Sequence, residues 1–296
     1  MRRLVLLALV GLGAQLVDGS LGMGYGVTSA TLLVASGIGP AAASAAIHFS
    51  EIGTSLVSGL SHHSLGNVDW RTVGVLALPG FVGAFAGATL LVNLDAGTAV
   101  PVVATILVVL GTYVTYRFLS AARRLQFGPR PAKRILAPIG LVAGTLDAVG
   151  GGGWGPVGTS SLLASGRLEP RKVVGSVDTA EFVVAVGGSL GFLVGLGAQG
   201  IEWAYVAALM LGGVVAAPLA AVLVRYLPAR VLGVAAGGLI VLTNLTTLAE
   251  ELGATGLTVA MLAASVFTLW VLWVAWAVKL DQDEAGLSRP GIVVNT

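Results

Sequence analysis

The chain has 296 residues, of which 56% are hydrophobic and 10% are charged, and its mean hydropathy is +0.93. The charged share is about two fifths of that of an ordinary globular domain, so a water-soluble fold of this length is excluded. A net charge of +2 is too small and too scattered to indicate a nucleic-acid partner, and the absence of Cys excludes disulfides, thiolate metal sites and cysteine nucleophiles.

The first apolar segment is broken near its middle by glycines, between residues 17 and 26. The flanking pieces, about 13 residues each, would rise only about 20 Å as helices, which is too short for a hydrocarbon core of about 30 Å. We therefore predict a discontinuous or re-entrant helical hairpin. Hydrophobicity continues to residue 278, so this segment is interpreted as mature structure and not as a secretory signal.

Three apolar runs follow, at 41–60, 72–92 and 99–119, each long enough to span a bilayer as a helix. A basic segment then connects the two halves of the chain, and its Lys and Arg residues indicate the cytoplasmic side. We assign residues 1–120 to a first transmembrane repeat and 121–134 to a cytoplasmic linker.

The second half opens with another glycine break, at 146–158, and continues with apolar runs at 173–198, 203–224 and 231–248. A seventh run, 257–278, lies outside the repeat. The sequence therefore predicts an all-α polytopic membrane protein with two homologous halves. The remaining boundaries are 135–250 for the second repeat, 251–280 for a C-terminal transmembrane helix and 281–296 for a polar, disordered tail.

The two halves align with each other at an offset of about 130 residues, which indicates an internal repeat. The aligned pairs are Asp18 with Asp147, Gly22 with Gly151, Gly24 with Gly153, Tyr25 with Trp154, Gly26 with Gly155, His48 with Asp178 and Glu51 with Glu181. An odd number of crossings in each half would make the repeats inverted, as in many secondary transporters. Arg2 and Arg3 would then face outward, against the usual charge bias, and a different depth of the first hairpin would make the repeats parallel instead.

Six ionisable residues lie inside the apolar segments: Asp18, His48, Glu51, Asp147, Asp178 and Glu181. Each would cost about 2.5 kcal/mol or more if it faced lipid, so we expect them in the protein interior or in a water-filled cavity. They are candidates for binding a solute. The alternative is that they are protonated or paired groups that hold the helices together.

One face of the run 41–60 carries Ser44, His48, Glu51, Ser55 and Ser58, at spacings of 4, 3, 4 and 3. This polar stripe either lines a solute path or supplies hydrogen bonds between helices. A metal site at His48 and Glu51 lacks a third ligand at matching spacing, so no metal is expected. His62 and His63, in the following loop, are expected to be solvated.

The glycines of the two breaks form a second candidate site, consisting of Gly22, Gly24, Gly26, Gly151, Gly153 and Gly155. A broken helix exposes free backbone N–H groups where its second piece begins, and the helix dipole favours an anion there. Tyr25 and Trp154 either form the walls of that site or fill core volume. The alternative for the glycines is a seam for close helix packing.

The stretch from Gln15 to Gly26, the run from Ala41 to Glu51 and Gly66-Asn67-Val68-Asp69-Trp70 resemble the TauE/SafE sulfite-exporter family of bacterial membrane permeases. The resemblance covers roughly residues 5 to 250. It implies export of sulfite, organosulfonates such as sulfoacetate, or related sulfur-containing anions across the cytoplasmic membrane.

We therefore expect a secondary transporter and not an enzyme, with a small anionic solute and the lipid bilayer as partners and with no cofactor, metal or nucleic acid. The sequence is also compatible with an oligomer. Two alternatives stay open at this point. One is an intramembrane enzyme with His48 and Glu51 as an acid–base pair, and the other is an accessory scaffold without transport activity.

Overall fold

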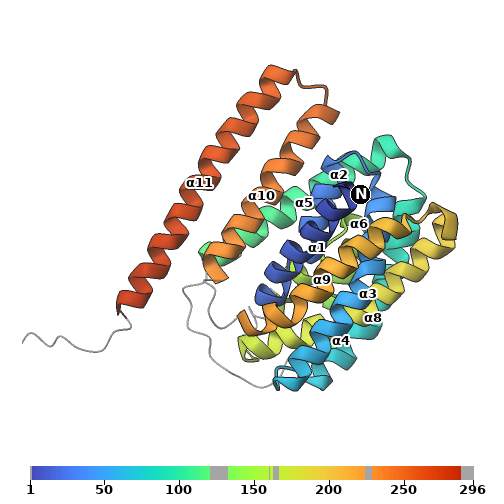
Figure 1. Cartoon of the computed structure of the whole chain (residues 1–296), viewed down its shortest axis with the longest axis vertical. Helices are drawn as coiled ribbons and strands as arrows, with labels where there is room; N and C mark the ends of the chain where they lie inside the picture. The colour runs from blue at the N-terminus through green and yellow to red at the C-terminus, as the bar shows by residue number, and fades with distance from the viewer. Residues whose placement is uncertain (1, 121–132, 160, 163–166, 224–228, 288–296) are drawn as a thin grey trace, which may run out of the picture.

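A computed structural model describes the chain except for residues 1, 121–132, 160, 163–166, 224–228 and 288–296 (Figure 1). Its described elements are all helical and contain no strand. The expected linker therefore lies outside the described residues apart from its last two positions. The predicted fold class, a polytopic helical protein, is confirmed.

The first half contains five helices: α1 (Arg2–Leu21), α2 (Tyr25–Ala35), α3 (Pro40–Ser64), α4 (Trp70–Val92) and α5 (Ala96–Leu119). The expected break lies between α1 and α2. The expectation that α1 is a short piece of about 13 residues is wrong, because it has 20 residues and passes through Gly11 and Gly19 without interruption. Both glycines lie against α9 (Trp203–Leu223), where a Cβ at Gly11 would be 2.2 Å from the carbonyl oxygen of Leu209.

The second half also begins with a broken helical segment. It contains α6 (Lys133–Gly150), the short π-type helix η1 (Trp154–Thr159), α8 (Pro170–Leu196), the 3-10 turn η2 (Ala198–Gly200), α9, α10 (Ala229–Glu251) and finally α11 (Gly256–Leu287). With 18 residues, α6 is also longer than expected. The tail predicted to begin at residue 281 is helical as far as Leu287, since α11 continues that far.

Six described helices are long and apolar enough to cross a membrane, namely α4, α5, α8, α9, α10 and α11. The helix α3 has 25 residues but does not reach the same hydropathy, because its polar stripe replaces apolar side chains. Two spans begin at an aspartate that caps the helix. Asp69 Oδ1 accepts the Thr72 N–H at 3.0 Å before α4, and Asp95 Oδ1 accepts the Thr98 N–H at 3.0 Å before α5. Hydrogen bonds from the Thr98 hydroxyl and N–H hold the pKa of Asp95 below its ordinary value.

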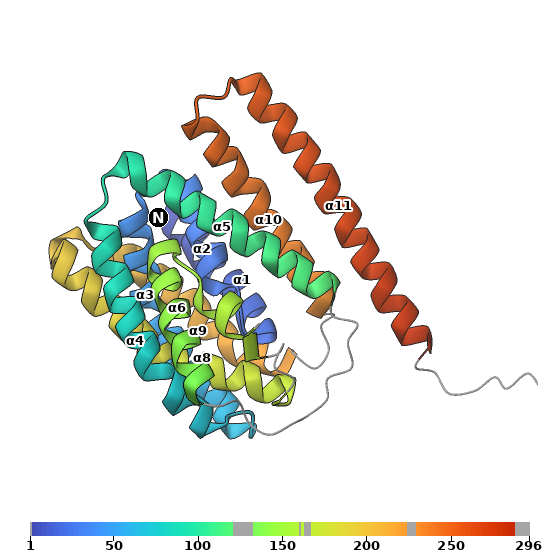
Figure 2. The ribbon, with the colours of Figure 1, turned by 180° about the vertical axis from the view of Figure 1, so that it is seen from behind.

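The two halves interlock, because helices of one half pack mainly against helices of the other. Thus α1 packs on α9, α4 on α6 and α8, α3 on α8 and α9, and α5 on α10. At the outer edge, α11 lies beside α10 in both views (Figures 1 and 2). Large apolar side chains are exposed along α11, including Leu257, Met261 and Trp276, as is appropriate for a helix that faces lipid.

The central pair, α3 and α8, runs antiparallel. Gly188 near the end of α8 lies against His48 near the start of α3, while Gly175 near the start of α8 lies against Asn67 just after α3. These helices are the predicted repeat equivalents. An antiparallel course is the arrangement that inverted halves require, and the repeat itself stays a prediction.

Candidate functional site

The two helix breaks cross each other at the centre of the molecule. Gly22, Gly24 and Gly151 have φ values of +68°, +132° and +70°, a region that favours glycine and ends the helical path. A Cβ at Gly26 would lie 2.4 Å from the Gly151 carbonyl oxygen, and one at Gly152 would lie 1.9 Å from the Val27 nitrogen. These distances leave no room for a Cβ, so the glycines allow the two breaks to pack closely.

The backbone N–H groups at the breaks donate to carboxylates of the protein itself. Asp147 Oδ1 accepts the N–H groups of Gly153 at 2.8 Å and Trp154 at 3.0 Å, while Asp18 Oδ1 accepts the Tyr25 N–H at 3.4 Å. The first break is also joined to the second half by the Thr159 hydroxyl, which donates to the Gly22 carbonyl. An external anion would reach these N–H groups only if the aspartates moved away, so anion binding at the breaks stays an untested prediction.

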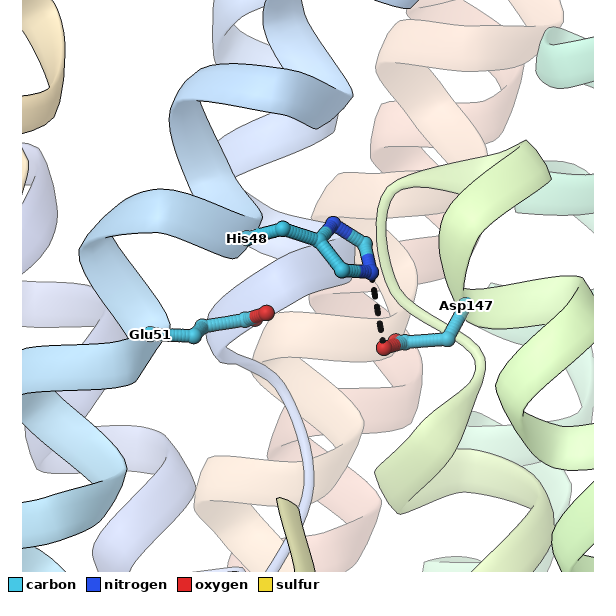
Figure 3. A group of neighbouring side chains, drawn as sticks. All are labelled: His48, Glu51 and Asp147. Atoms are coloured by element: carbon cyan, nitrogen blue, oxygen red, sulfur yellow. Dashed lines mark ion pairs between the residues drawn. The ribbon is translucent and has the colours of Figure 1, made fainter. Parts of the chain in front are cut away.

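Close to the second break, His48 and Glu51 of α3 point toward Asp147 of α6 (Figure 3). His48 Nε2 lies 3.3 Å from Asp147 Oδ2, and the three groups offer ligand atoms within 4.8 Å of one another. On its other side, His48 Nδ1 lies 3.0 Å from the Ser44 carbonyl oxygen. Since a carbonyl only accepts, Nδ1 carries the hydrogen, and Nε2 is the nitrogen that exchanges a proton with its surroundings.

This group is buried but incompletely hydrogen-bonded. His48, Glu51 and Asp147 are 0%, 1% and 1% exposed. Both Glu51 oxygens, His48 Nε2 and Asp147 Oδ2 lack a hydrogen-bond partner with good geometry. Unpaired buried polar atoms are costly, and where several converge they commonly mark a binding site.

The structure places a third possible metal ligand beside His48 and Glu51, where no metal was expected. We expected none because a third ligand was missing near His48 and Glu51, and Asp147 supplies one from the other half of the chain. One imidazole and two carboxylates fit a divalent ion as well as they fit a proton and a polar solute. The expected absence of a metal stays untested.

A second group lies at the positions that the predicted repeat alignment pairs with the first, with Asp178 in place of the histidine. Asp18, from the end of α1, meets Asp178 and Glu181 of α8, with ligand atoms again within 4.8 Å. Ser55 Oγ donates to Glu181 Oε2 at 3.3 Å, and Ser58 Oγ donates to Asp178 Oδ2 at 2.5 Å. Each group thus combines an aspartate from the break of one half with two residues on the central helix of the other.

The aromatic residues of the breaks fill the interior and are hydrogen-bonded. The Tyr25 hydroxyl lies 2.9 Å from Ser50 Oγ, and Trp154 Nε1 donates to the Val177 carbonyl at 3.0 Å. Both side chains are 1% exposed. They brace the breaks against α3 and α8, so core filling is shown, whereas contact with a solute is not tested.

Comparison with known proteins identifies the chain. The family model described as "Sulfite exporter TauE/SafE" matches residues 7–247. The protein belongs to the TauE/SafE sulfite exporter family. It is also similar to a "Probable membrane transporter protein YtnM" of Bacillus subtilis (strain 168), with 48% identity over 254 residues, covering 85% of this chain and 84% of that protein. No solved structure matches.

The TauE/SafE assignment and the six long apolar helices make the protein a multi-pass membrane transporter of the cell membrane. The predicted family and localisation are thereby confirmed. In this transporter the two buried groups lie close together, because Ser55, one turn after Glu51 on α3, donates to Glu181 Oε2 at 3.3 Å. Together they form one polar centre, to which both halves contribute.

Sequence reasoning misplaced one residue of this TauE/SafE protein. His62 was expected to be a solvated loop side chain, but it is 1% exposed and lies in the last turns of α3. Its Nε2 lies 3.6 Å from Asp178 Oδ2, and Asn67 Nδ2 lies 3.4 Å from its Nδ1. The signal was present in the spacing, since His62 follows Ser58 by four residues and continues the polar stripe of α3.

Proposed function

We propose that this transporter moves a small sulfur-containing anion, such as sulfite or an organosulfonate, outward across the cytoplasmic membrane. The description of the family supports the solute class and the outward direction, and the name of the relative supports membrane transport. The structural observation that carries it is the buried group of His48, Glu51 and Asp147 beside the second break, in which both Glu51 oxygens lack a hydrogen-bond partner.

These side chains offer the chemistry that a sulfonate or sulfite needs. When the ring is protonated, His48 Nε2 donates a hydrogen bond and the imidazolium charge attracts an oxyanion, and a protonated Glu51 is a second donor. The N–H groups of Gly153 and Trp154 donate to the Asp147 carboxylate, which stabilises its negative charge and holds it away from the solute. An entering anion would take over the contact of His48 with Asp147.

The driving force need not involve ATP, because the sequence contains no nucleotide-binding fingerprint. For a monoanion, a potential that is negative inside favours export by about 2.3 kcal/mol per 100 mV. Uniport is therefore physically sufficient, and coupling to another ion is an addition to it.

The proposal is tested with the purified full-length protein in proteoliposomes. Counterflow is measured with labelled sulfite, sulfoacetate, thiosulfate, sulfate and taurine, under both signs of membrane potential. We expect exchange of at least one sulfur anion, at ten times or more the rate in protein-free vesicles, and its loss in His48→Ala, which removes a donor of the central group. The exposed neighbour His63 provides the matched control, His63→Ala. Exchange of none of the five solutes would reject this substrate class.

A further inference from the structure

We infer that this transporter carries protons along a polar row between α3 and α8, from the α3–α4 loop to the buried carboxyl groups at its centre. The row consists of Asn67, His62, Asp178 with Ser58, and Glu181 with Ser55. This inference rests on the proposed function, because it assigns to the same site a second transported species, the proton.

The row is continuous in space although its members come from two halves of the chain. Asn67 Nδ2 is 3.4 Å from His62 Nδ1, and His62 Nε2 is 3.6 Å from Asp178 Oδ2. Asp178 Oδ2 also accepts Ser58 Oγ at 2.5 Å, and Glu181 Oε2 accepts Ser55 Oγ at 3.3 Å. Asp178 and Glu181 meet Asp18 within 4.8 Å. The His62–Asp178 separation of 3.6 Å exceeds a hydrogen bond, so proton transfer there requires the two side chains to approach each other.

His62 is placed as a proton-transfer group. It is 1% exposed, while His63, Ser64, Leu65 and Gly66 beside it are at the surface. An N–H of the Asn67 amide faces Nδ1, which makes Nδ1 the acceptor and leaves the hydrogen on Nε2, where it faces Asp178. When the Asn67 amide turns away, a proton can bind Nδ1, and this is balanced by release of the Nε2 proton to Asp178 Oδ2. The ring then holds one proton as before, in the other tautomer.

The groups that face Asp178 explain why a proton would remain there. Asp18 approaches from α1, Glu181 lies one turn along α8, and Ser58 and His62 approach from α3. Glu51 lies on the same face of α3, one turn before Ser55, which donates to Glu181. Three carboxylates at this separation repel one another strongly in a buried site. Sharing protons among them removes that repulsion and creates a store that is filled through His62.

Among the described residues of α3 and α8, the printed distances link the row to the α3–α4 loop. Beyond His48, the described polar contacts of the stripe on α3 end at Ser44, whose hydroxyl donates to the Ala148 carbonyl at 2.7 Å. The α8 residues that face His48 are Gly188 and Phe192, and the Phe192 ring is 5.6 Å from the imidazole. Protons therefore have a row of exchangeable groups from the α3–α4 loop and no equivalent row along α3 and α8 from the opposite end.

The test uses the full-length protein in proteoliposomes that contain a pH-sensitive dye, with the membrane potential clamped. A gradient of sulfoacetate, whose sulfonate group stays ionised, or of another panel anion that the wild type exchanges, drives net flux. We expect net flux to move protons in the wild type. In His62→Gln, net anion flux and proton flux should fall at least tenfold, while counterflow stays within twofold of wild type because exchange needs no net proton movement. The matched control His63→Gln should resemble the wild type.

The failures can be told apart. Exchange without proton movement during net flux of the wild type, or unchanged proton flux in His62→Gln, would overturn the proton route and leave the proposed function intact. Absence of exchange for every anion would overturn the proposed function. The proton route can then still be tested without substrate. The measurement is the rate at which the infrared band of protonated carboxyl groups responds to an external pH jump. Equal rates in wild type and His62→Gln would overturn it.

Discussion

At the scale of single residues, Glu51 differs from the other buried acids. Asp147 accepts two backbone N–H groups, Asp178 accepts Ser58 and Glu181 accepts Ser55. Glu51 is 1% exposed and neither of its oxygens has a hydrogen-bond partner. An ionised carboxylate without a partner is strongly disfavoured in an apolar interior. Glu51 is therefore the residue expected to take up a proton when an anion binds.

Proton uptake by Glu51 would make the rate of anion counterflow depend on pH. A protonated Glu51 donates a hydrogen bond to an oxyanion and an ionised one repels it, so counterflow should weaken as pH rises. Glu51→Gln keeps a donor but cannot ionise, so it should flatten the pH profile while exchange is retained. Glu181→Gln should flatten it less, because Ser55 already satisfies one oxygen of Glu181. Identical profiles in Glu51→Gln and wild type would make Glu51 a structural residue.

At the scale of helices, glycine sets how closely the two halves approach. Along α4, a Cβ at Gly83 would lie 2.1 Å from the Leu141 carbonyl oxygen of α6, while a Cβ at Gly144 would lie 2.2 Å from the Gly80 carbonyl oxygen. The pairing of α1 with α9 has the same character, since a Cβ at Gly212 would be 1.9 Å from the Ala8 carbonyl oxygen. Because these glycines carry no side chain, the helix backbones come into direct contact and gain dispersion energy from it.

Gly83→Ala should therefore loosen the α4–α6 contact and destabilise the protein by about 1–3 kcal/mol, as overpacking does. Gly74→Ala is the matched control on the same helix, because a Cβ there meets nothing within 4 Å. It should be neutral or slightly stabilising, since Ala favours helix over Gly. The measurement is thermal stability of the purified protein in detergent, and equal melting temperatures for the two variants would contradict the close-packing account.

A helix cap gives a second prediction at this scale. Asp69 Oδ1 accepts both the N–H and the hydroxyl of Thr72 at the start of α4, at 3.0 and 3.1 Å. Asp69→Ala should cost about 1 kcal/mol through loss of the cap, and Asp69→Asn should cost less because an amide oxygen still accepts. The same melting experiment checks this order, and equal losses in the Asn and Ala variants would show that the negative charge matters more than the cap.

At the scale of the whole molecule, the antiparallel course of α3 and α8 decides at which face of the molecule these helices and their neighbours begin and end. Asp69 N–H donates to Ser176 Oγ at 2.8 Å, so the end of α3 and the start of α8 lie at one face. A Cβ at Gly195 would contact Val92, so the ends of α4 and α8 lie at the other. Two central helices from the two halves thus enter the membrane from opposite sides.

Single cysteines introduced into this Cys-free chain test that arrangement in intact cells. Cysteines replacing His63 and Glu169 should react with an impermeant reagent from the same side. Cysteines replacing Asp95 and Gln199 should react from the opposite side, and the basic residues near α8 predict that the first pair is cytoplasmic. All four positions are at least partly exposed in the structure. Labelling of positions 63 and 169 from different sides would contradict the antiparallel arrangement.

The sequence by itself determined the fold class, the membrane location, the family and the stripe on α3, because hydropathy, helical spacing and local motifs are properties of contiguous residues. It also identified both breaks and all the acids that lie near them. The tertiary structure decided what those acids contact. Only folding brings Asp147 to His48 and Asp18 to Asp178, each across the boundary between the halves.

The structure also decided which residues are buried by distant parts of the chain, because local sequence patterns describe such burial poorly. His62 follows the periodicity of the stripe, yet its burial depends on Asn67 and on α8, which covers it from more than a hundred residues away along the chain. The full lengths of α1 and α6 were not predicted, for a related reason. A glycine within a run of apolar residues breaks a helix or packs it, and which of the two occurs depends on whether another backbone, such as that of α9 at Gly11, lies against it.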